Sequence, residues 1–356
     1  MTESMMFNQG ANAAVARCLI IMPLHNRRHF LDQAFDSLRQ QVFTDWSLVI
    51  VDDGSTDEPL AKIEELAQTL SQPITYIKQQ NGGPGSARAR GQRCLSDEEY
   101  VAFFDSDDVW LPAYLKTMIG HLDANESLDW IFCPCRRINY ADGRVLLSST
   151  FLDEVTNTPL NFKKLGVCKR DGVAIFQDNN ALAITQLKQP INAGFQNSVL
   201  RKVIMKRIEV PNYRIGEDRY FLMQAILTNF NIGYIETVLV TYNVHNDNLS
   251  DTNQGCTDVA RSVFTQNELC KSFNDIKKLT KDKVICSVID SEVKKINFWI
   301  IGYYYYWQNG YYSQGLKQMH SQLFLKPHSI TYAKTYTVCL IKWFVKERIQ
   351  SSSRNG

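Results

Sequence analysis

Three aspartates lie within four positions at the end of an apolar run. The segment FFDSDDVW, residues 103–110, contains Asp105, Asp107 and Asp108. Ionised carboxylates at this spacing repel one another, and the repulsion costs free energy unless a cation or hydrogen-bond donors offset it. Carboxylate oxygens are ligands that both Mg²⁺ and Mn²⁺ favour. The cluster therefore predicts a bound divalent metal ion.

Two further stretches combine acidic residues with apolar ones. VIVDDGSTD places Asp52 and Asp53 after an apolar run, and YRIGEDRYFLMQAI places Glu217 and Asp218 before an apolar stripe at helical spacing. Taken alone, the first is also typical of a turn, because Asp, Gly, Ser and Thr favour tight turns and helix caps. The second also has a structural explanation, since a helix dipole favours acidic residues in the first turn.

Apolar runs and helical patterns alternate around the first two acidic stretches. Short apolar runs predict strands at residues 18–22, 48–51, 74–77 and 100–104. Helical spacing predicts helices at 31–42 and 63–70, with Asn26 as N-cap of the first, and a further helix follows the glycine-rich loop NGGPGSARARG. This alternation favours an α/β fold with a mostly parallel sheet and helices on both faces. Ligands bind beyond the carboxyl ends of such strands, so the two acidic stretches can converge there.

Three stretches in order, IIMPLHNRRHFL, VIVDDGSTD and YVAFFDSDDVWLP, resemble the GT-A glycosyltransferases of family 2. The resemblance is strongest over about residues 18–125 and continues more weakly to about residue 250. It implies a Rossmann-like GT-A domain and a nucleotide-sugar donor, with a UDP-sugar as the first expectation. It also implies inverting transfer to a hydroxyl of a saccharide or lipid-linked saccharide, aided by Mn²⁺ or Mg²⁺.

The resemblance implies roles for the acidic residues and their neighbours. Asp52 matches the acid that contacts the nucleoside base, and Asp105 and Asp107 match the acids that contact the ribose and the metal. Asp53 and Asp108 are expected to support them. The expected nucleotide-sugar site comprises Pro23, Asn26, Asp52, Asp53, Arg88, Asp105 and Ser106.

Two further contacts follow from the same resemblance. Arg88 lies in ARARG, which is similar to the family element ARNxG and has Ala89 in place of the usual Asn, so Arg88 is expected to contact the nucleotide. His245 in YNVHNDNLS matches a histidine that reaches the metal or diphosphate, although a lone histidine is more often structural or exposed. The expected metal ligands are thus Asp107, Asp105 and His245.

The proposed chemistry needs a cation and a base. A cation that bridges the donor diphosphate stabilises the charge that builds up on the leaving group. A base must take the proton from the acceptor hydroxyl on the opposite face of the sugar. Asp218 is the candidate base, with Glu217 as the next residue to consider.

Length and composition set broader limits. The chain of 356 residues has 39 basic and 37 acidic residues, a balance that argues against a nucleic-acid binder. Its nine cysteines form no CxxC pair, which favours a reducing cytoplasm over a disulfide framework. No secretory leader or run of about 18 apolar residues is visible, so a cytoplasmic protein that does not span the membrane is expected.

The last hundred residues differ in charge. Residues 251–356 contain 15 Lys and Arg against 8 Asp and Glu, and helical spacing predicts helices there. We therefore expect a flexible tail at 1–16, a catalytic domain at 17–250 and a helical region at 251–356. The final segment, KTYTVCLIKWFVKERIQ, mixes apolar and basic residues, which suits either a helix packed on its own domain or a helix docked on a membrane surface.

Two other functions compete with sugar transfer. A nucleotidyltransferase of related fold would ordinarily show a glycine-rich loop with Lys or Arg after the first strand, where this chain has PLHNRRHF. A catalytically silent nucleotide-sugar-binding module would keep Asp52 and Asp107 but would need no base.

Overall fold

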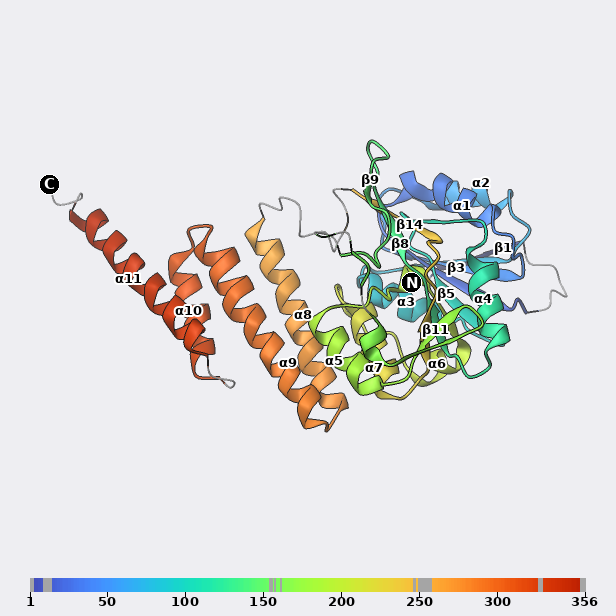
Figure 1. Cartoon of the computed structure of the whole chain (residues 1–356). Coiled ribbons are helices and arrows are strands. Elements are labelled where there is room, and N and C mark those ends of the chain that lie inside the picture. Colours follow the sequence, from blue (N-terminus) through green and yellow to red (C-terminus); the bar gives the residue numbers. More distant parts are fainter. Residues whose placement is uncertain are drawn as a thin grey trace. The chain divides into compact units, whose positions relative to one another are not determined.

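The computed structural model describes residues 3–8, 15–153, 156, 158–160, 162–245, 248, 258–325 and 329–352. The chain divides into two compact units, Met1–Leu249 and Ser250–Gly356 (Figure 1). The first unit is built around a large sheet, and the described part of the second is helical. Each unit has its own cluster of buried apolar side chains.

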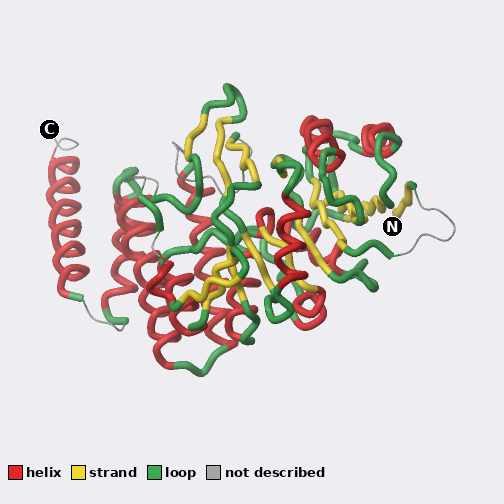
Figure 2. The backbone as a smooth tube through the Cα atoms, turned by 45° about the vertical axis from the view of Figure 1, so that its right-hand side comes forward, coloured by secondary structure: helices red, strands yellow, loops and turns green. Residues whose placement is uncertain are grey.

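A ten-stranded sheet forms the centre of the first unit (Figure 2, yellow). Its strands, in chain order, are β1 (Glu3–Phe7), β2 (Cys18–Leu24), β3 (Trp46–Asp53), β4 (Ile74–Gln79), β5 (Tyr100–Phe103), β7 (Trp130–Phe132), β10 (Val167–Arg170), β11 (Val173–Phe176), β12 (Ser198–Arg201) and β13 (Ile232–Tyr234). They lie side by side in the order β1-β4-β3-β2-β5-β12-β7-β13-β11-β10.

The predicted α/β architecture is confirmed, but the sheet is mixed. Strands β4, β3, β2 and β5 are parallel because α1 (Leu31–Arg39), α2 (Leu60–Ala67) and α3 (Pro84–Gln92) each return the chain to the same edge. Strand β12 runs antiparallel to both β5 and β7, and β10, β11 and β1 also join antiparallel neighbours. Strands β7 and β13 are again parallel to each other, so the sheet expected to be mostly parallel contains parallel pairs in both halves but an unbroken run of them only in the half built from the alternating pattern.

A second sheet has four strands in the order β6-β14-β8-β9. They are β6 (Val109–Trp110), β8 (Cys135–Asn139), β9 (Val145–Leu147) and β14 (Val240–Val244). The other helices of this unit are η1 (Arg28–Phe30), α4 (Tyr114–Ala124), η2 (Phe162–Leu165), α5 (Asn179–Lys188), η3 (Phe195–Asn197), α6 (Lys202–Arg207) and α7 (Glu217–Leu227). Strand β14 pairs antiparallel with β6, which directly follows the aspartate cluster.

The prediction of a flexible tail at residues 1–16 is wrong for Glu3–Phe7. These residues form β1, which pairs antiparallel with β4 at the edge of the sheet. The side-chain amide of Asn8 then donates hydrogen bonds to the carbonyls of Ala67 (2.8 Å) and Leu70 (3.0 Å). A short edge strand gains order from backbone pairing with its neighbour, so its own sequence needs no visible periodicity. Residues 1, 2 and 9–14 lie outside the described residues.

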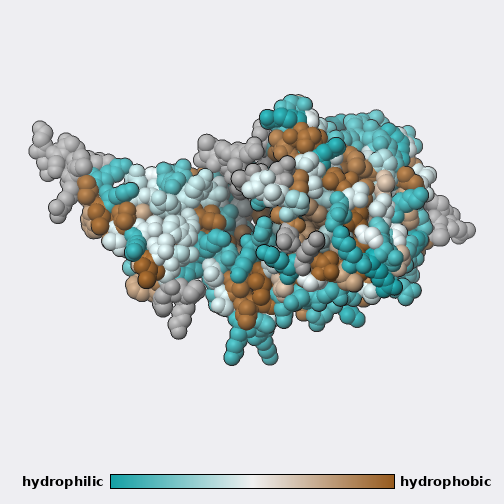
Figure 3. All heavy atoms as spheres, in the orientation of Figure 1, coloured by the Kyte–Doolittle hydropathy of each residue, from teal (hydrophilic) through white to brown (hydrophobic). Residues whose placement is uncertain are grey.

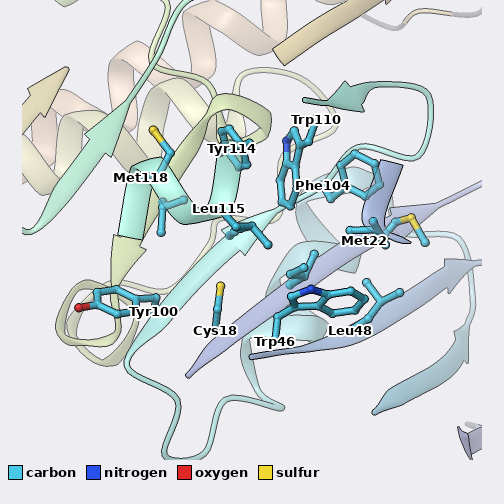
Figure 4. Packing of buried hydrophobic residues seen from close by; sticks show 14 of the residues in the cluster. Cys18, Met22, Trp46, Leu48, Tyr100, Phe104, Trp110, Tyr114, Leu115 and Met118 are labelled. Carbon is cyan, nitrogen blue, oxygen red and sulfur yellow. The ribbon is translucent and has the colours of Figure 1, made fainter. Parts of the chain in front are cut away.

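Aromatic packing fixes the end of β5. Trp110 stacks on Tyr114 of α4 with ring centroids 4.4 Å apart, and Phe104 lies 4.6 Å from the Trp110 ring (Figure 4). All three side chains are fully buried, and such ring pairs add to the free energy gained from burying their apolar surface. The loop that carries Asp105 and Asp107 is therefore held by Phe104 on one side and by Trp110 on the other.

The second unit consists of α8 (Val259–Leu279), α9 (Lys283–Lys295), a π-helix η4 (Ile296–Trp307), α10 (Tyr312–Leu323) and α11 (Ile330–Ser352). The chain continues from α9 directly into η4, so this stretch is part α-helix and part π-helix. Gly302 and Gly315 let η4 and α10 approach closely, since a Cβ at Gly302 would lie 2.8 Å from Cγ of Met319. Among the described residues, no helix has the length and apolar character needed to cross a bilayer.

Gly85 provides a stability test of the contact that positions α3. A methyl group there would lie 2.6 Å from the carbonyl oxygen of Tyr213, and backbone atoms cannot rotate away. We expect Gly85→Ala to lower the free energy of unfolding by about 1–3 kcal/mol through overpacking. Gly120 in α4 is the matched control, because a Cβ added there would have no other atom within 4 Å and alanine favours helix.

Thermal unfolding followed by circular dichroism checks this expectation. Gly120→Ala should leave the melting temperature unchanged or raise it, since alanine is the better helix former by up to about 1 kcal/mol. An equal response to the two substitutions would contradict the close packing of α3 on the 211–213 segment.

Candidate active site

The first two acidic stretches lie at the ends of β3 and β5, the two strands that pair in parallel with β2. In the register of the sheet, Leu24 at the end of β2 pairs with Asp52 near the end of β3, and Ile21 pairs with Phe103 at the end of β5. The loops that follow these strands therefore leave the same edge of the sheet. The tertiary structure brings together loops from four separate segments: 25–28, 54–57, 80–83 and 104–108.

Asp52 organises the turn after β3. Its side chain is buried, its Oδ1 accepts a hydrogen bond from the backbone N–H of Ser55 (2.8 Å), and its Oδ2 accepts one from the Tyr76 hydroxyl (2.6 Å). Both carboxylate oxygens thus have partners within the protein. Asp52 thus holds the loop after β3 in place. Its partner Tyr76 was not anticipated, because it lies in the apolar pattern of a strand.

Asp53 shapes the glycine-rich loop before α3. Its Oδ1 accepts hydrogen bonds from the backbone N–H of Gly82 and from the side-chain amide of Gln79, both at 2.8 Å. Its Oδ2 accepts one from the backbone N–H of Gly83 at 2.7 Å. Gly83 has a φ of +91°, which glycine adopts readily, and Pro84 then opens the helix. A buried carboxylate thus fixes the loop that starts α3.

Asn26 joins two loops instead of capping a helix, so the N-cap prediction is wrong. Its φ is +52°, its backbone N–H donates to Oγ of Ser55 (3.1 Å), and its Oδ1 accepts from the backbone N–H of Thr56 (2.8 Å). The neighbouring loop captures the side chain that would otherwise cap. Pro23 lies within β2 and pairs with Val51 of β3, the residue before Asp52.

Asp107 and His245 meet because of the β14–β6 register. Val240 pairs with Trp110 and Thr241 with Val109, so each further step along β14 moves back toward the aspartates. Nε2 of His245 lies 3.1 Å from Oδ2 of Asp107. The structure therefore brings together two predicted metal ligands that are 138 residues apart in the sequence.

Arg27 and Asn243 complete the surroundings of Asp107. The Arg27 guanidinium lies 3.5 Å from Oδ2 of Asp107, and the side-chain amide of Asn243 donates to the Asp107 carbonyl oxygen (2.6 Å). Burial acts to raise the pKa of Asp107, but the His245 hydrogen bond and the Arg27 charge outweigh it, so the pKa lies below its ordinary value. Asp107 is thus an ionised carboxylate with limited exposure. Arg27 lies within the motif PLHNRRHFL and Asn243 within YNVHNDNLS. Nothing in the sequence pattern singled out either residue as a neighbour of Asp107.

Asp108 and Ser106 face inward. Asp108 is buried, and its Oδ1 accepts a hydrogen bond from the backbone N–H of Asn243 at 3.2 Å. Its Oδ2 has no hydrogen-bond partner among the described residues. Burial, followed by the charges of Asp107 and Asp105, raises the pKa of Asp108 well above its ordinary value. Ser106 is also buried.

Arg88 connects Asp105 to Glu217. Its Nη2 donates to Oδ1 of Asp105 at 2.5 Å and its Nη1 donates to Oε1 of Glu217. The guanidinium is buried and lies 5.3 Å from the centroid of the Phe195 ring. Although burial alone would lower it, the pKa of Arg88 is raised by the charges of Asp105 and Glu217. Arg88 is therefore a permanent cation shared by two carboxylates.

One guanidinium cannot offset every acid in this region. Burial raises the pKa of Glu217 to about 7 despite the opposing charge of Arg88, and the charge of Asp218 acts in the same direction as burial. Burial likewise raises the pKa of Asp105, with Asp107 adding to the shift. Asp105 and Glu217 are thus held close to Arg88 at an electrostatic cost.

The two candidate bases have different environments. Glu217 is buried against Arg88, whereas Asp218, the next residue in the first turn of α7, is partly exposed. Oδ1 of Asp218 accepts a hydrogen bond from the backbone N–H of Arg219 at 2.6 Å. Of the pair, Asp218 is the carboxylate that is open to a molecule outside the fold.

The donor set fits a cation that is shared with a substrate. Among the described residues, no three His, Cys, Asp or Glu side chains are grouped as they would be around a metal. Asp107 and His245 provide a carboxylate and an imidazole, and Asp105 is bound to Arg88. Mg²⁺ in particular is often held by one or two carboxylates together with substrate phosphates and water. The residues present therefore suit a cation completed by a diphosphate, and not one held by protein side chains alone.

Comparison with known protein families matches the part of the chain that contains the loops after β2, β3 and β5. Residues 19–187 match the model of the family described as glycosyl transferase family 2. The chain contains a family 2 glycosyltransferase domain. The matched segment includes the loops after β2, β3 and β5, and it ends within α5, before Glu217, Asp218 and His245.

Curated relatives are similar to this chain over only part of their own length. The succinoglycan biosynthesis protein ExoW of Rhizobium meliloti is 36% identical over 103 residues, which is 28% of this chain and 32% of the relative. The chain spans only about a third of the length of the first curated relatives it matches, at 32% and 31%.

Solved structures show that the family 2 domain has the GT-A fold. Staphylococcus aureus TarS 1–349 in complex with UDP-GlcNAc has a TM-score of 0.57 at 18% identity, covering 86% of this chain and 80% of that one. The mannosyltransferase PcManGT from Pyrobaculum calidifontis, in complex with GDP-Man and Mn²⁺, has a TM-score of 0.52 at 14% identity, covering 96% and 84%. The predicted fold, with its helical C-terminal region, is confirmed.

The Arg88 bridge predicts a pH-dependent loss of stability. Arg88→Ala would leave the buried Glu217 and the partly buried Asp105 without their cation, which should lower the free energy of unfolding by about 3–5 kcal/mol. Burial already raises the pKa of Glu217, and loss of Arg88 raises it further. The native variant then binds more protons than its unfolded chain, so its stability should fall as pH rises above the unfolded pKa.

Urea unfolding of both proteins across a pH series measures this effect. Arg93→Ala is the matched control, because Arg93 pairs with Glu209 at 3.1 Å in an exposed position and should contribute no more than about 1 kcal/mol. Equal losses in the two variants, or a deficit for Arg88→Ala that does not grow with pH, would contradict the bridge.

Proposed function

We propose that the chain is an inverting glycosyltransferase that moves a sugar from a nucleoside diphosphate donor to a hydroxyl acceptor. The observation that carries this proposal is the pairing of Asp107 with His245 at the sheet edge where the loops of the family 2 domain converge. A carboxylate and an imidazole at 3.1 Å, next to the Arg27 guanidinium, suit a cation and a diphosphate.

The donor would lie across the loops after β2, β3 and β5. Asp52 and Asp53 hold the turn and the glycine-rich loop in place, and Asn26 ties the first two loops together. We assign Asp107 and His245 as the ligands of Mn²⁺ or Mg²⁺, with Asp105 beside them. The cation would stabilise the negative charge of the departing nucleoside diphosphate. A UDP-sugar is the donor class we propose, as UDP-GlcNAc is bound in the TarS complex.

Asp218 is proposed as the base and Glu217 as the residue that positions Arg88. Asp218 is partly exposed, whereas both the burial of Glu217 and its bond to Arg88 limit its access to an acceptor. In the reaction, the acceptor hydroxyl oxygen attacks the anomeric carbon, its proton passes to a carboxylate oxygen of Asp218, and the bond to the diphosphate breaks.

The acceptor class we propose is a growing saccharide or a lipid-linked saccharide. ExoW carries the name of a succinoglycan biosynthesis protein, which supports a role in making a polysaccharide. The segment between the metal motif and the proposed base contains polar side chains that include Asp178, Asn179 and Gln196. Of these, Asp178 serves as the cap of α5, because its Oδ1 accepts from the backbone N–H of Ala181 at 2.9 Å.

Nucleotide binding tests the metal site. UDP near one hundred times its dissociation constant should raise the melting temperature by roughly 5–10 °C with Mn²⁺ or Mg²⁺ present. Excess chelator should remove most of the shift, because the cation joins Asp107 and His245 to the diphosphate. Asp107→Ala should behave like the chelated protein, and Asp97→Ala, an exposed aspartate away from the loops, should behave like the wild type. Stabilisation by UDP that is indifferent to chelator and to Asp107→Ala would rule out the metal bridge.

Turnover tests the base. Asp218→Asn keeps the shape of the side chain but removes its basic oxygen, so turnover should fall by about 10²- to 10⁴-fold while the affinity for UDP changes little. Asp107→Ala should weaken both. The measurement is single-turnover transfer from a panel of UDP-sugars to saccharide acceptors. Near wild-type turnover in Asp218→Asn would reject the assignment, and UDP binding without transfer or donor hydrolysis in the wild type would favour a silent binding module.

A further inference from the structure

The end of the chain contains a long stretch without acidic residues. Residues 293–346 include no Asp or Glu, and they contain seven lysines: Lys294, Lys295, Lys317, Lys326, Lys334, Lys342 and Lys346. This stretch covers the π-helix η4, α10 and most of α11. Its formal charge of +7 contrasts with a net charge of +2 for the whole chain. The positive charge is therefore concentrated in one unit.

One face of α11 packs within its own unit. Cys339 is buried in a cluster with Phe298, Leu316 and Met319 of η4 and α10. The partly buried side chains that pack against this cluster include Tyr332, Tyr336, Leu340 and Trp343, all from α11. These positions recur at helical spacing and form one side of the helix. Packing of the helix on its own unit, one of the two interpretations of the final segment, explains why this side of α11 is apolar.

The opposite face of α11 is also apolar, and it is exposed. Its apolar side chains, each at least half exposed, are Ile330, Val338, Ile341, Phe344 and Val345. Positions 334, 338, 341 and 345 follow one another by four, three and four residues, so Lys334 lies on this face, and Lys342 adjoins it. Figure 3 shows hydrophobic side chains on the outer surface of this unit. A helix that only packed on its own unit would carry polar residues here.

The charge around this face indicates its partner. A second copy of the chain would bring lysines against lysines in a symmetric contact, with no acidic residue in 293–346 to pair with them. An anionic lipid surface instead attracts lysines and accepts apolar and aromatic side chains at its boundary. We propose that the exposed face of α11 docks on the surface of an anionic phospholipid bilayer. This proposal does not rest on the proposed sugar transfer.

Vesicle co-sedimentation of the full chain tests the docking. The protein should bind vesicles that contain phosphatidylglycerol, bind vesicles of phosphatidylcholine alone much more weakly, and lose most of the binding at high salt. Lys334→Gln with Lys342→Gln should lower the affinity by roughly five-fold for each lysine removed. Val345→Glu should lower it by more than about five-fold, because it adds a repelled charge to the apolar face.

Val42→Glu is the matched control. Val42 of the first unit is 55% exposed and Val345 is 54% exposed, so both substitutions place a carboxylate at a comparable surface position. Circular dichroism confirms folding, and the lysine variant offers a second test should Val345→Glu unfold. The proposal is overturned when the wild type fails to bind anionic vesicles at low salt, or when Val345→Glu binds as well as Val42→Glu. A wild-type dimer that Val345→Glu dissociates, with no lipid binding by either, would assign the face to contact between copies.

Discussion

The bridge from Arg88 to Asp105 and Glu217 is the interaction on which the site depends. It joins α3, the loop after β5 and the start of α7, which are separate in the sequence, through one buried guanidinium. A buried cation with two carboxylate partners tolerates little displacement, because each lost contact leaves a charge without compensation. The close approach of α3 to the 211–213 segment at Gly85 serves the same geometry, since it brings α7 within reach of Arg88.

Burial separates acids that are alike in sequence into different roles. Asp52 and Asp53 are buried, and their oxygens accept hydrogen bonds that hold loops. Asp105 and Glu217 share Arg88, while Asp107 faces His245 and Arg27. Environment, and not residue type, therefore decides which carboxylates hold the fold and which remain available for a ligand.

The two units differ in the physical character of their surfaces. In the first unit, negative charge is gathered at the edge of a sheet and faces the buried Arg88 and the partly buried Arg27. In the second, residues 293–346 carry only positive charge, and a helix exposes an apolar face. The proposed sugar transfer and the proposed docking on anionic lipid would together suit an enzyme whose acceptor is attached to a membrane.

The alternating apolar runs of residues 18–104 determined much of the fold, because local periodicity specifies strands and helices directly. The motifs likewise predicted Asp107, His245 and Arg88 as residues of the candidate site. Tertiary pairing decided the rest. The antiparallel placement of β12 depends on contacts between distant strands, and the short β1 takes its order from pairing with β4. The meeting of His245 with Asp107 depends on the register of β14, and the division between Glu217 and Asp218 depends on which side chain Arg88 reaches. Such choices are made by packing and charge between residues far apart in the chain, which no local pattern records.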